Sequence, residues 1–118
     1  AAPATALTVR LVGARQFAAM KPSAWLVNVA RGALVDTDAL VDALTSGQIA
    51  GAGLDVTDPE PLPDGHRLWS LPNAIVTPHD SNPPSLRVPA YAEHVVENVT
   101  RFASGTELAA IIDTSAGY

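Results

Sequence analysis

The segment Leu26–Gly32 constrains the fold of this chain more than any other stretch. The run from Ala24 to Val29 is mostly apolar, which is typical of a strand buried on both faces of a sheet. Arg31 follows where such a strand ends. Ligands of open α/β sheets bind beyond the carboxyl ends of the strands, and a guanidinium group there suits a ligand that carries a carboxylate. The alternative is an exposed arginine in a turn, and this segment alone leaves both interpretations open.

A helix is predicted directly after this strand. Asp36 or Thr37 would cap its start, and Gly47 lies in the position that commonly ends a helix. A second short buried strand is predicted over Ile49–Val56 and a third strand over Ala74–Thr77. This alternation of strand and helix favours an α/β fold with a mostly parallel sheet.

The flanking segments are predicted to be mainly helical. Val9–Met20 has helical periodicity, and Gly13 in its middle indicates two short pieces. An amphipathic helix is predicted over Ala90–Ala103. Ile111–Ile112 is expected to add an edge strand or to pack on a neighbouring element. Trp69, between the second and third strands, is expected to fill part of the core.

The composition excludes several classes of protein. With 118 residues, of which 47% are apolar and 16% charged, the chain is expected to fold around a core. Its net charge of −5 and scattered basic residues exclude a nucleic acid or an anionic membrane as partner. It has no cysteine, and no metal site is predicted. No apolar run is long enough to span a bilayer and no signal peptide is recognisable, so we expect a soluble cytoplasmic protein.

Polar side chains follow all three predicted strands. Arg31 follows the first, Asp55 ends the second and is followed by a loop with Asp58 and Glu60, and His79 follows the third. If the strands are parallel, these residues meet at one edge of the sheet. A carboxylate favours the charged form of a neighbouring histidine, and such a pair is a suitable general acid and base. Each residue alone is more often structural, but their convergence favours a catalytic site.

Three motifs carry a resemblance to a known family. They are Leu-Val-Asn-Val-Ala-Arg-Gly at 26–32, Gly-Leu-Asp-Val-Thr-Asp-Pro-Glu-Pro-Leu at 53–62 and Val-Thr-Pro-His at 76–79. Their order and spacing resemble the phosphoglycerate dehydrogenase-like family of D-isomer-specific 2-hydroxyacid dehydrogenases. The resemblance covers almost the whole chain. It implies an oxidoreductase that transfers a hydride between NAD(H) and C2 of a small D-2-hydroxy or 2-keto acid.

The resemblance also implies individual roles. Arg31 would bind the substrate carboxylate, and His79 would give or take the proton at the substrate hydroxyl. Glu60, five positions after Asp55, would hold and tune His79. Asp55 would meet the carboxamide side of the nicotinamide. The residues implied to bind the cofactor are Ala2, Pro3, Thr8, Val29, Ala30, Arg31, Asp55, His79, Asp80, Ser81 and Asn82.

The chain departs from the family pattern in two respects. It lacks the Gly-x-Gly-x-x-Gly phosphate loop and the acidic residue that holds the adenosine ribose, which leaves the choice between NAD and NADP open. Asp80 stands where the family more often has an apolar or small residue. We therefore expect a Rossmann-like fold in which residues 1–82 are the C-terminal half of a dinucleotide-binding domain. Residues 83–118 would be a linker and a C-terminal helix that returns toward the substrate domain.

Two hypotheses of function follow. The chain is part of a longer dehydrogenase, or it is a truncated, catalytically incomplete fragment that acts as an interaction or dimerisation module. A sheet cut before its first strands would expose the edge of the strand that holds Val27 and Val29. We therefore expect association into a homo-oligomer, or marginal stability of the isolated chain.

We predict that the 118-residue chain alone binds NAD weakly or not at all. The glycine-rich loop and the helix N-terminus behind it form most of the pyrophosphate site in such domains, and the sequence contains no such loop. Isothermal titration calorimetry measures this binding directly. Tight, stoichiometric binding of NAD would contradict the prediction.

Overall fold

The computed structural model of the chain describes residues 2–115, which belong to two compact units. The first unit ends at Asp80 and the second begins at Ser81. The boundary predicted after Asn82 separates a cofactor-binding half-domain from a linker and helix within a larger enzyme. It stays a prediction.

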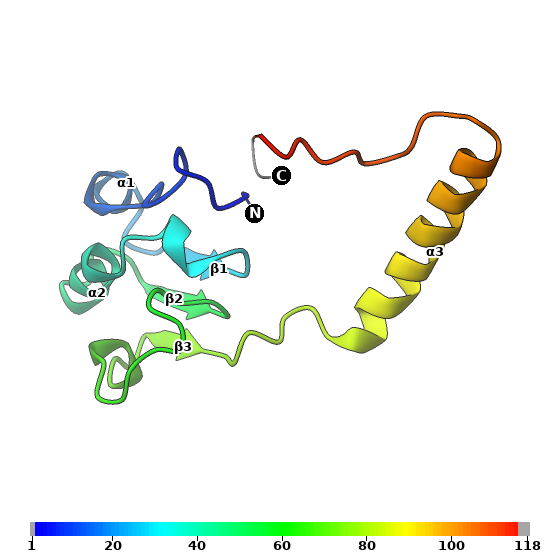
Figure 1. The fold of residues 1–118 in the computed structure, drawn as a ribbon. Coiled ribbons are helices and arrows are strands. Elements are labelled where there is room, and N and C mark those ends of the chain that lie inside the picture. Colours follow the sequence, from blue (N-terminus) through cyan, green and yellow to red (C-terminus); the bar gives the residue numbers. More distant parts are fainter. Residues whose placement is uncertain (1, 116–118) are drawn as a thin grey trace. The chain divides into compact units, whose positions relative to one another are not determined.

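A parallel three-stranded sheet forms the centre of the first unit, with its strands side by side in Figure 1. The strands are β1 (Trp25–Asn28), β2 (Gly51–Leu54) and β3 (Ala74–Val76). They lie in the order β1-β2-β3, and Ala52 in the middle strand pairs with Leu26 on one side and Ala74 on the other. Because both pairings are parallel, all three carboxyl ends lie at one edge of the sheet. The predicted α/β fold with a mostly parallel sheet is confirmed.

The helix α2 (Thr37–Thr45) connects β1 to β2 and begins and ends as the sequence predicts. The Asp36 carboxylate accepts a hydrogen bond of 3.1 Å from the backbone N–H of Ala39, which satisfies one free donor of the first turn. Gly47, two residues beyond the helix, has a φ of +71°, a conformation that glycine adopts without steric cost. Local capping therefore determines both ends of α2.

Only the second of the two helical pieces expected in residues 9–20 is present. It is α1 (Ala14–Ala18). Before it, Val12 forms a parallel β-bridge with Val35, in which the Val12 N–H donates to the carbonyl of Leu34 at 3.0 Å. The backbone of Val12 is thereby paired with a distant segment instead of with its own helix turn, so the first predicted piece is wrong.

The core lies between the sheet and the two helices. Its most deeply buried side chains are Phe17, Leu40, Ile49, Leu68 and Val56. The expectation that Trp69 fills the core is wrong: Leu68 is 1% exposed, whereas Trp69 is 54% exposed. Both belong to the short 3₁₀ helix η2 (Arg67–Trp69), in which neighbouring side chains point about 120° apart, so only one of them can face the core.

The expectation that β1 is buried on both faces is also wrong. Its side chains alternate, with Asn28 6% exposed on one face and Trp25 and Val27 52% and 69% exposed on the other. In the part of the chain that the structure describes, β1 pairs only with β2. The strand that holds Val27 is therefore an edge strand, as expected, and its outer face is open to solvent.

The second unit contains the long helix α3 (Pro84–Ala103). It begins six residues before the predicted start, because Pro84 occupies the first helical position, where its missing N–H costs no hydrogen bond. The apolar stripe predicted for this helix is solvent-exposed, and none of its residues is buried. The members of the stripe are Tyr91, Val95, Val99 and Phe102, and all four are exposed.

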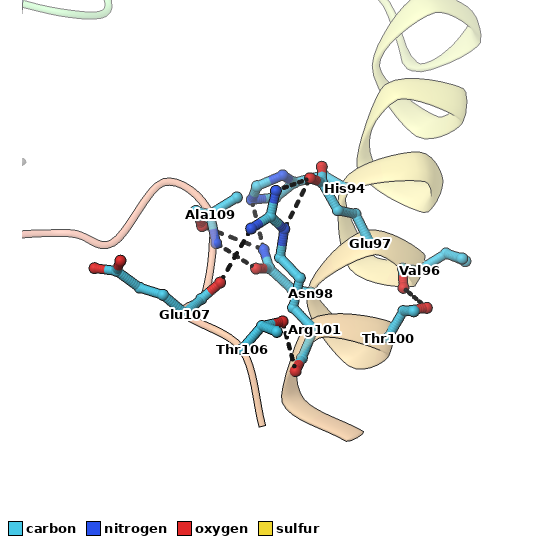
Figure 2. Close-up of polar contacts among 9 residues, drawn as sticks. All are labelled: His94, Val96, Glu97, Asn98, Thr100, Arg101, Thr106, Glu107 and Ala109. Carbon is cyan, nitrogen blue, oxygen red and sulfur yellow. Dashed lines mark hydrogen bonds and ion pairs between the residues drawn. The ribbon is translucent and has the colours of Figure 1, made fainter. Parts of the chain in front are cut away.

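Polar contacts hold the segment after α3 along the helix (Figure 2). The Asn98 side chain accepts a hydrogen bond of 2.8 Å from the Ala109 N–H and donates one of 3.3 Å to the Ala109 carbonyl. Arg101 binds the Glu97 carboxylate and donates to the carbonyl of Glu107 at 3.2 Å. Beyond this segment, Ile111–Ile112 is exposed and forms no strand, which corrects that expectation.

No helix within residues 2–115 combines the length and the apolar character needed to cross a membrane.

Gly32 is where the turn after β1 packs against the loop after β2. A Cβ atom at this position would lie 1.9 Å from the carbonyl oxygen of Thr57 and 2.7 Å from the backbone nitrogen of Asp58. Both are backbone atoms, so neither can rotate away. The close approach of the two loops requires glycine here.

We predict that Gly32→Ala lowers the free energy of unfolding by about 3 kcal/mol, because the two loops must separate to admit the methyl group. Gly53→Ala is the matched control: its Cβ would have 4.0 Å to its nearest neighbour, a methyl group of Val27. Since alanine lowers the entropy of the unfolded strand, this control should gain about 0.5 kcal/mol. Urea unfolding of both variants measures the difference, and equal stabilities would contradict the prediction.

Candidate active site

The turn after β1 brings Arg31 to the carboxyl edge of the sheet. Asn28, the last residue of β1, is 6% exposed, and its side chain bridges this turn. It donates a hydrogen bond of 2.9 Å to the Arg31 carbonyl and accepts one of 3.1 Å from the Ala30 N–H. The exposed guanidinium of Arg31 donates to the Ala30 carbonyl at 2.7 Å. Asn28 therefore determines the backbone path that presents Arg31.

The loop after β2 carries the candidate carboxylates. Asp55 is 6% exposed, and its N–H donates to the carbonyl of Asn28 at 3.0 Å, which continues the pairing of the two strands. The next turn is held by two hydroxyl groups: Thr57 donates to the Pro59 carbonyl at 2.9 Å, and Thr37 of α2 donates to the Asp58 carbonyl at 2.7 Å. These bonds fix the loop immediately before Glu60.

The Glu60 carboxylate contacts the His79 ring. The distance from Glu60 Oε1 to His79 Nδ1 is 2.6 Å, within the range of a charge-assisted hydrogen bond. Both side chains are a little under half exposed, so the pair is open to a small molecule. The expected proximity of these two groups, from loops nineteen residues apart, is confirmed.

A cavity of about 260 Å³ lies beside this pair. Asp55, Glu60 and His79 line it together with Trp69. The indole of Trp69 is held by a hydrogen bond of 3.1 Å from its Nε1 to the Pro63 carbonyl. Trp69 is thus not part of the core, and its exposed side chain forms part of the cavity wall.

A second cavity of about 260 Å³ lies along β1. It gathers three of the residues implied to bind the cofactor, Ala2, Val29 and Ala30, among mostly apolar side chains. Thr8 and Pro3 do not line this cavity. Thr8 instead donates a hydrogen bond of 2.6 Å to the Pro3 carbonyl, which closes the loop that leads away from Ala2.

The remaining cofactor candidates follow His79. The Asp80 N–H donates a hydrogen bond of 3.1 Å to the Asp55 carboxylate, so its backbone belongs to the site. Ser81 and Asn82 belong to the second unit, and their role stays a prediction.

Two residues with structural importance to the site, Asn28 and Thr77, are not among the candidates chosen from the sequence. Thr77 donates a hydrogen bond of 2.5 Å to the Asp55 carboxylate. The signal in the sequence was a single polar residue at the end of each apolar strand. Asn28 is buried, and a buried polar side chain costs stability unless it is hydrogen-bonded, so its place in an apolar strand indicates a specific partner.

Comparison with known proteins points to the family that the three sequence motifs resemble. Residues 1–81 match the family model of the D-isomer specific 2-hydroxyacid dehydrogenase NAD binding domain. Glyoxylate/hydroxypyruvate reductase B of Pectobacterium carotovorum is 54% identical over 77 residues, which are 65% of this chain and 24% of that protein.

Solved structures of dehydrogenases and reductases are similar to this chain. The NADPH-dependent glyoxylate/hydroxypyruvate reductase of Sinorhizobium meliloti, in complex with NADP and sulfate, is 34% identical with a TM-score of 0.86 over 99% of this chain and 38% of its own. D-lactate dehydrogenase of Lactobacillus jensenii with NAD⁺ is also 34% identical, with a TM-score of 0.75 over 96% of this chain and 38% of its own.

The chain is thus an α/β protein whose three parallel strands are followed by loops that carry an arginine, a glutamate and a histidine. It belongs to the D-isomer specific 2-hydroxyacid dehydrogenase family, in the part that forms the NAD-binding domain. It spans 24% to 38% of the length of these relatives.

We predict that Asn28→Ala lowers the free energy of unfolding by about 2 kcal/mol, because it leaves the Ala30 N–H and the Arg31 carbonyl without their buried partner. Asn73→Ala is the matched control. Its side chain makes one hydrogen bond, of 3.2 Å to the Leu44 carbonyl, and its loss should cost about 1 kcal/mol. Urea unfolding compares the two, and an Asn28→Ala variant as stable as the original chain would contradict the prediction.

Proposed function

We propose that this chain carries the catalytic residues of a NAD(P)-dependent dehydrogenase that acts on small D-2-hydroxy acids. The observation that carries the proposal is the 2.6 Å contact between Glu60 and the His79 ring, at the sheet edge where Arg31 also lies. The family assignment supports it.

The spacing of the strands suits a small 2-keto acid. Arg31 follows β1 and His79 follows β3, with β2 between them. Neighbouring strands lie about 4.8 Å apart, so the two strand ends are roughly 10 Å apart. With substrate bound, the side chains of Arg31 and His79 would reach inward from these two ends. The gap left between them suits a ligand whose carboxylate and carbonyl are on adjacent carbon atoms.

The roles of the three side chains follow from their chemistry. Arg31 binds the substrate carboxylate, and its positive charge polarises the adjacent carbonyl. His79 gives its proton to the carbonyl oxygen during reduction and takes it back during oxidation. Because Glu60 holds Nδ1, the ring presents Nε2 to the substrate.

The cofactor would lie along β1. The second cavity there is lined by small and apolar residues, among them Ala2, Val29 and Ala30, which suit the flat face of a nicotinamide ring. When bound, the nicotinamide supplies or accepts the hydride. Relatives in this family bind NADP in one structure and NAD⁺ in another, and we propose that this protein uses one of these two.

We also propose that the protein forms a homo-oligomer. The exposed outer face of β1 and the exposed stripe of α3 support association, since apolar surface of this kind is rarely left open to water. A cytoplasmic location stays a prediction.

We predict that the native gene product oxidises NADH or NADPH in the presence of glyoxylate or hydroxypyruvate, which the names of its relatives suggest as substrates. His79→Gln should lower kcat by about 10²- to 10⁴-fold, because no other group can deliver the proton from that position. Arg31→Gln should mainly raise KM, by about tenfold or more, because it removes a charge-assisted contact to the carboxylate.

Arg15→Gln is the control, since it removes a guanidinium from α1 and leaves the sheet edge intact. Nicotinamide absorbance at several substrate concentrations separates kcat from KM. Unchanged kcat in His79→Gln, or no turnover of any small 2-keto acid by the native protein, would refute the proposal.

A further inference from the structure

The backbone of His79 adopts a conformation that residues with a side chain seldom take. Its φ is +57°, in the left-handed region, at a cost of roughly 1–2 kcal/mol for a residue other than glycine. Such a conformation persists only where the surroundings hold it, and it is often found at functional sites. His79 is also the residue whose ring contacts Glu60. The backbone conformation and the direction of the ring are therefore linked.

One carboxylate oxygen holds the chain on both sides of His79. Asp55 Oδ1 accepts a hydrogen bond of 2.5 Å from the Thr77 hydroxyl and one of 3.1 Å from the Asp80 N–H. Thr77 lies two residues before His79, and Asp80 lies directly after it. For both donors to reach one oxygen, the backbone must turn sharply at Pro78 and His79.

The carboxylate itself is firmly placed. Asp55 is 6% exposed, and its N–H continues the pairing with β1 by donating to the Asn28 carbonyl. Thr77 is fixed in the same way, since its N–H donates to the Leu54 carbonyl at 2.9 Å and extends the pairing of β3 with β2. The two side chains thus face each other just beyond the ends of the neighbouring strands β2 and β3. Their contact follows from the register of the sheet.

We propose that Thr77 is a positioning residue for His79. Through its hydroxyl group it orients the Asp55 carboxylate toward the Asp80 N–H, and this arrangement holds the left-handed turn that directs the imidazole toward Glu60. The ring is then supported twice: Glu60 binds its Nδ1 atom, and the contact of Thr77 and Asp80 with Asp55 fixes its backbone. The consequence for proton transfer rests on the proposed function, whereas the positioning itself does not.

The test compares Thr77→Val with Thr77→Ser in the full chain. Valine keeps the branched shape and removes the hydroxyl, and serine keeps the hydroxyl. In Thr77→Val, hydrogen exchange of the Asp80 amide should accelerate on the order of tenfold, because the carboxylate that accepts it is no longer oriented. The ¹⁵N and ¹H resonances of the His79 ring should change, because the Nδ1 contact with Glu60 weakens. Thr77→Ser should restore the original values of both.

Thr100→Val is the matched control. It also removes a threonine hydroxyl, which donates to the Val96 carbonyl at 2.8 Å within α3, and it should leave both signals unchanged. Exchange of amides within β2, measured in the same experiment, reports whether the variants are folded.

If Thr77→Val is folded but keeps the Asp80 protection and the His79 ring signals of the original chain, the proposal is wrong. The same holds if Thr77→Ser behaves as Thr77→Val does. Absence of dehydrogenase activity in the native protein would refute the proposed function and leave these signals as they are, so the two failures are distinguishable.

Discussion

The parallel pairing of three short strands is the constraint on which the rest of this structure depends. Because β1, β2 and β3 run in the same direction, each must be joined to the next by a crossover, and all three must end at the same edge. Arg31, Asp55 and His79 are far apart in the sequence and follow three different strands. The sheet brings them to one edge. An antiparallel arrangement of the same segments would send the middle one to the opposite edge.

Beyond the strand ends, the site is held by hydrogen bonds from side chains to the backbone rather than by regular secondary structure. Asn28 bridges the turn that leads to Arg31, and Thr37 ties the start of α2 to the loop that leads to Glu60. At Gly32 the two loops approach so closely that no Cβ atom fits. A small number of residues outside the candidate catalytic set therefore determines where Arg31, Glu60 and His79 can lie.

The two units differ in how their apolar residues are used. In the first unit, α1, α2 and one face of the sheet enclose a core, while the other face of β1 exposes Trp25 and Val27. In the second unit, α3 has a regular apolar stripe and no buried residue. Within proteins, most of the stability of a helix comes from packing its amphipathic face against other elements. Both of these apolar surfaces are thus available for association.

Features that depend on a few neighbouring residues could be predicted from the sequence alone. The Asp36 cap and Gly47 mark the ends of α2 because capping and a positive φ are local properties. The order of strand and helix and the three motifs predict the parallel sheet, and with it the meeting of Glu60 and His79. The family assignment follows from the same motifs.

Features that depend on partners from elsewhere in the chain could not be predicted in this way. Val12 leaves its predicted helix because it pairs with Val35, and Trp69 is exposed because Leu68 takes the place in the core. Local periodicity describes which residues share a face, but not whether another element packs on that face. The left-handed backbone of His79 is the clearest example. Its local sequence does not favour that conformation, and only the buried Asp55 on the neighbouring strand, which binds the chain on both sides of it, makes it the stable one.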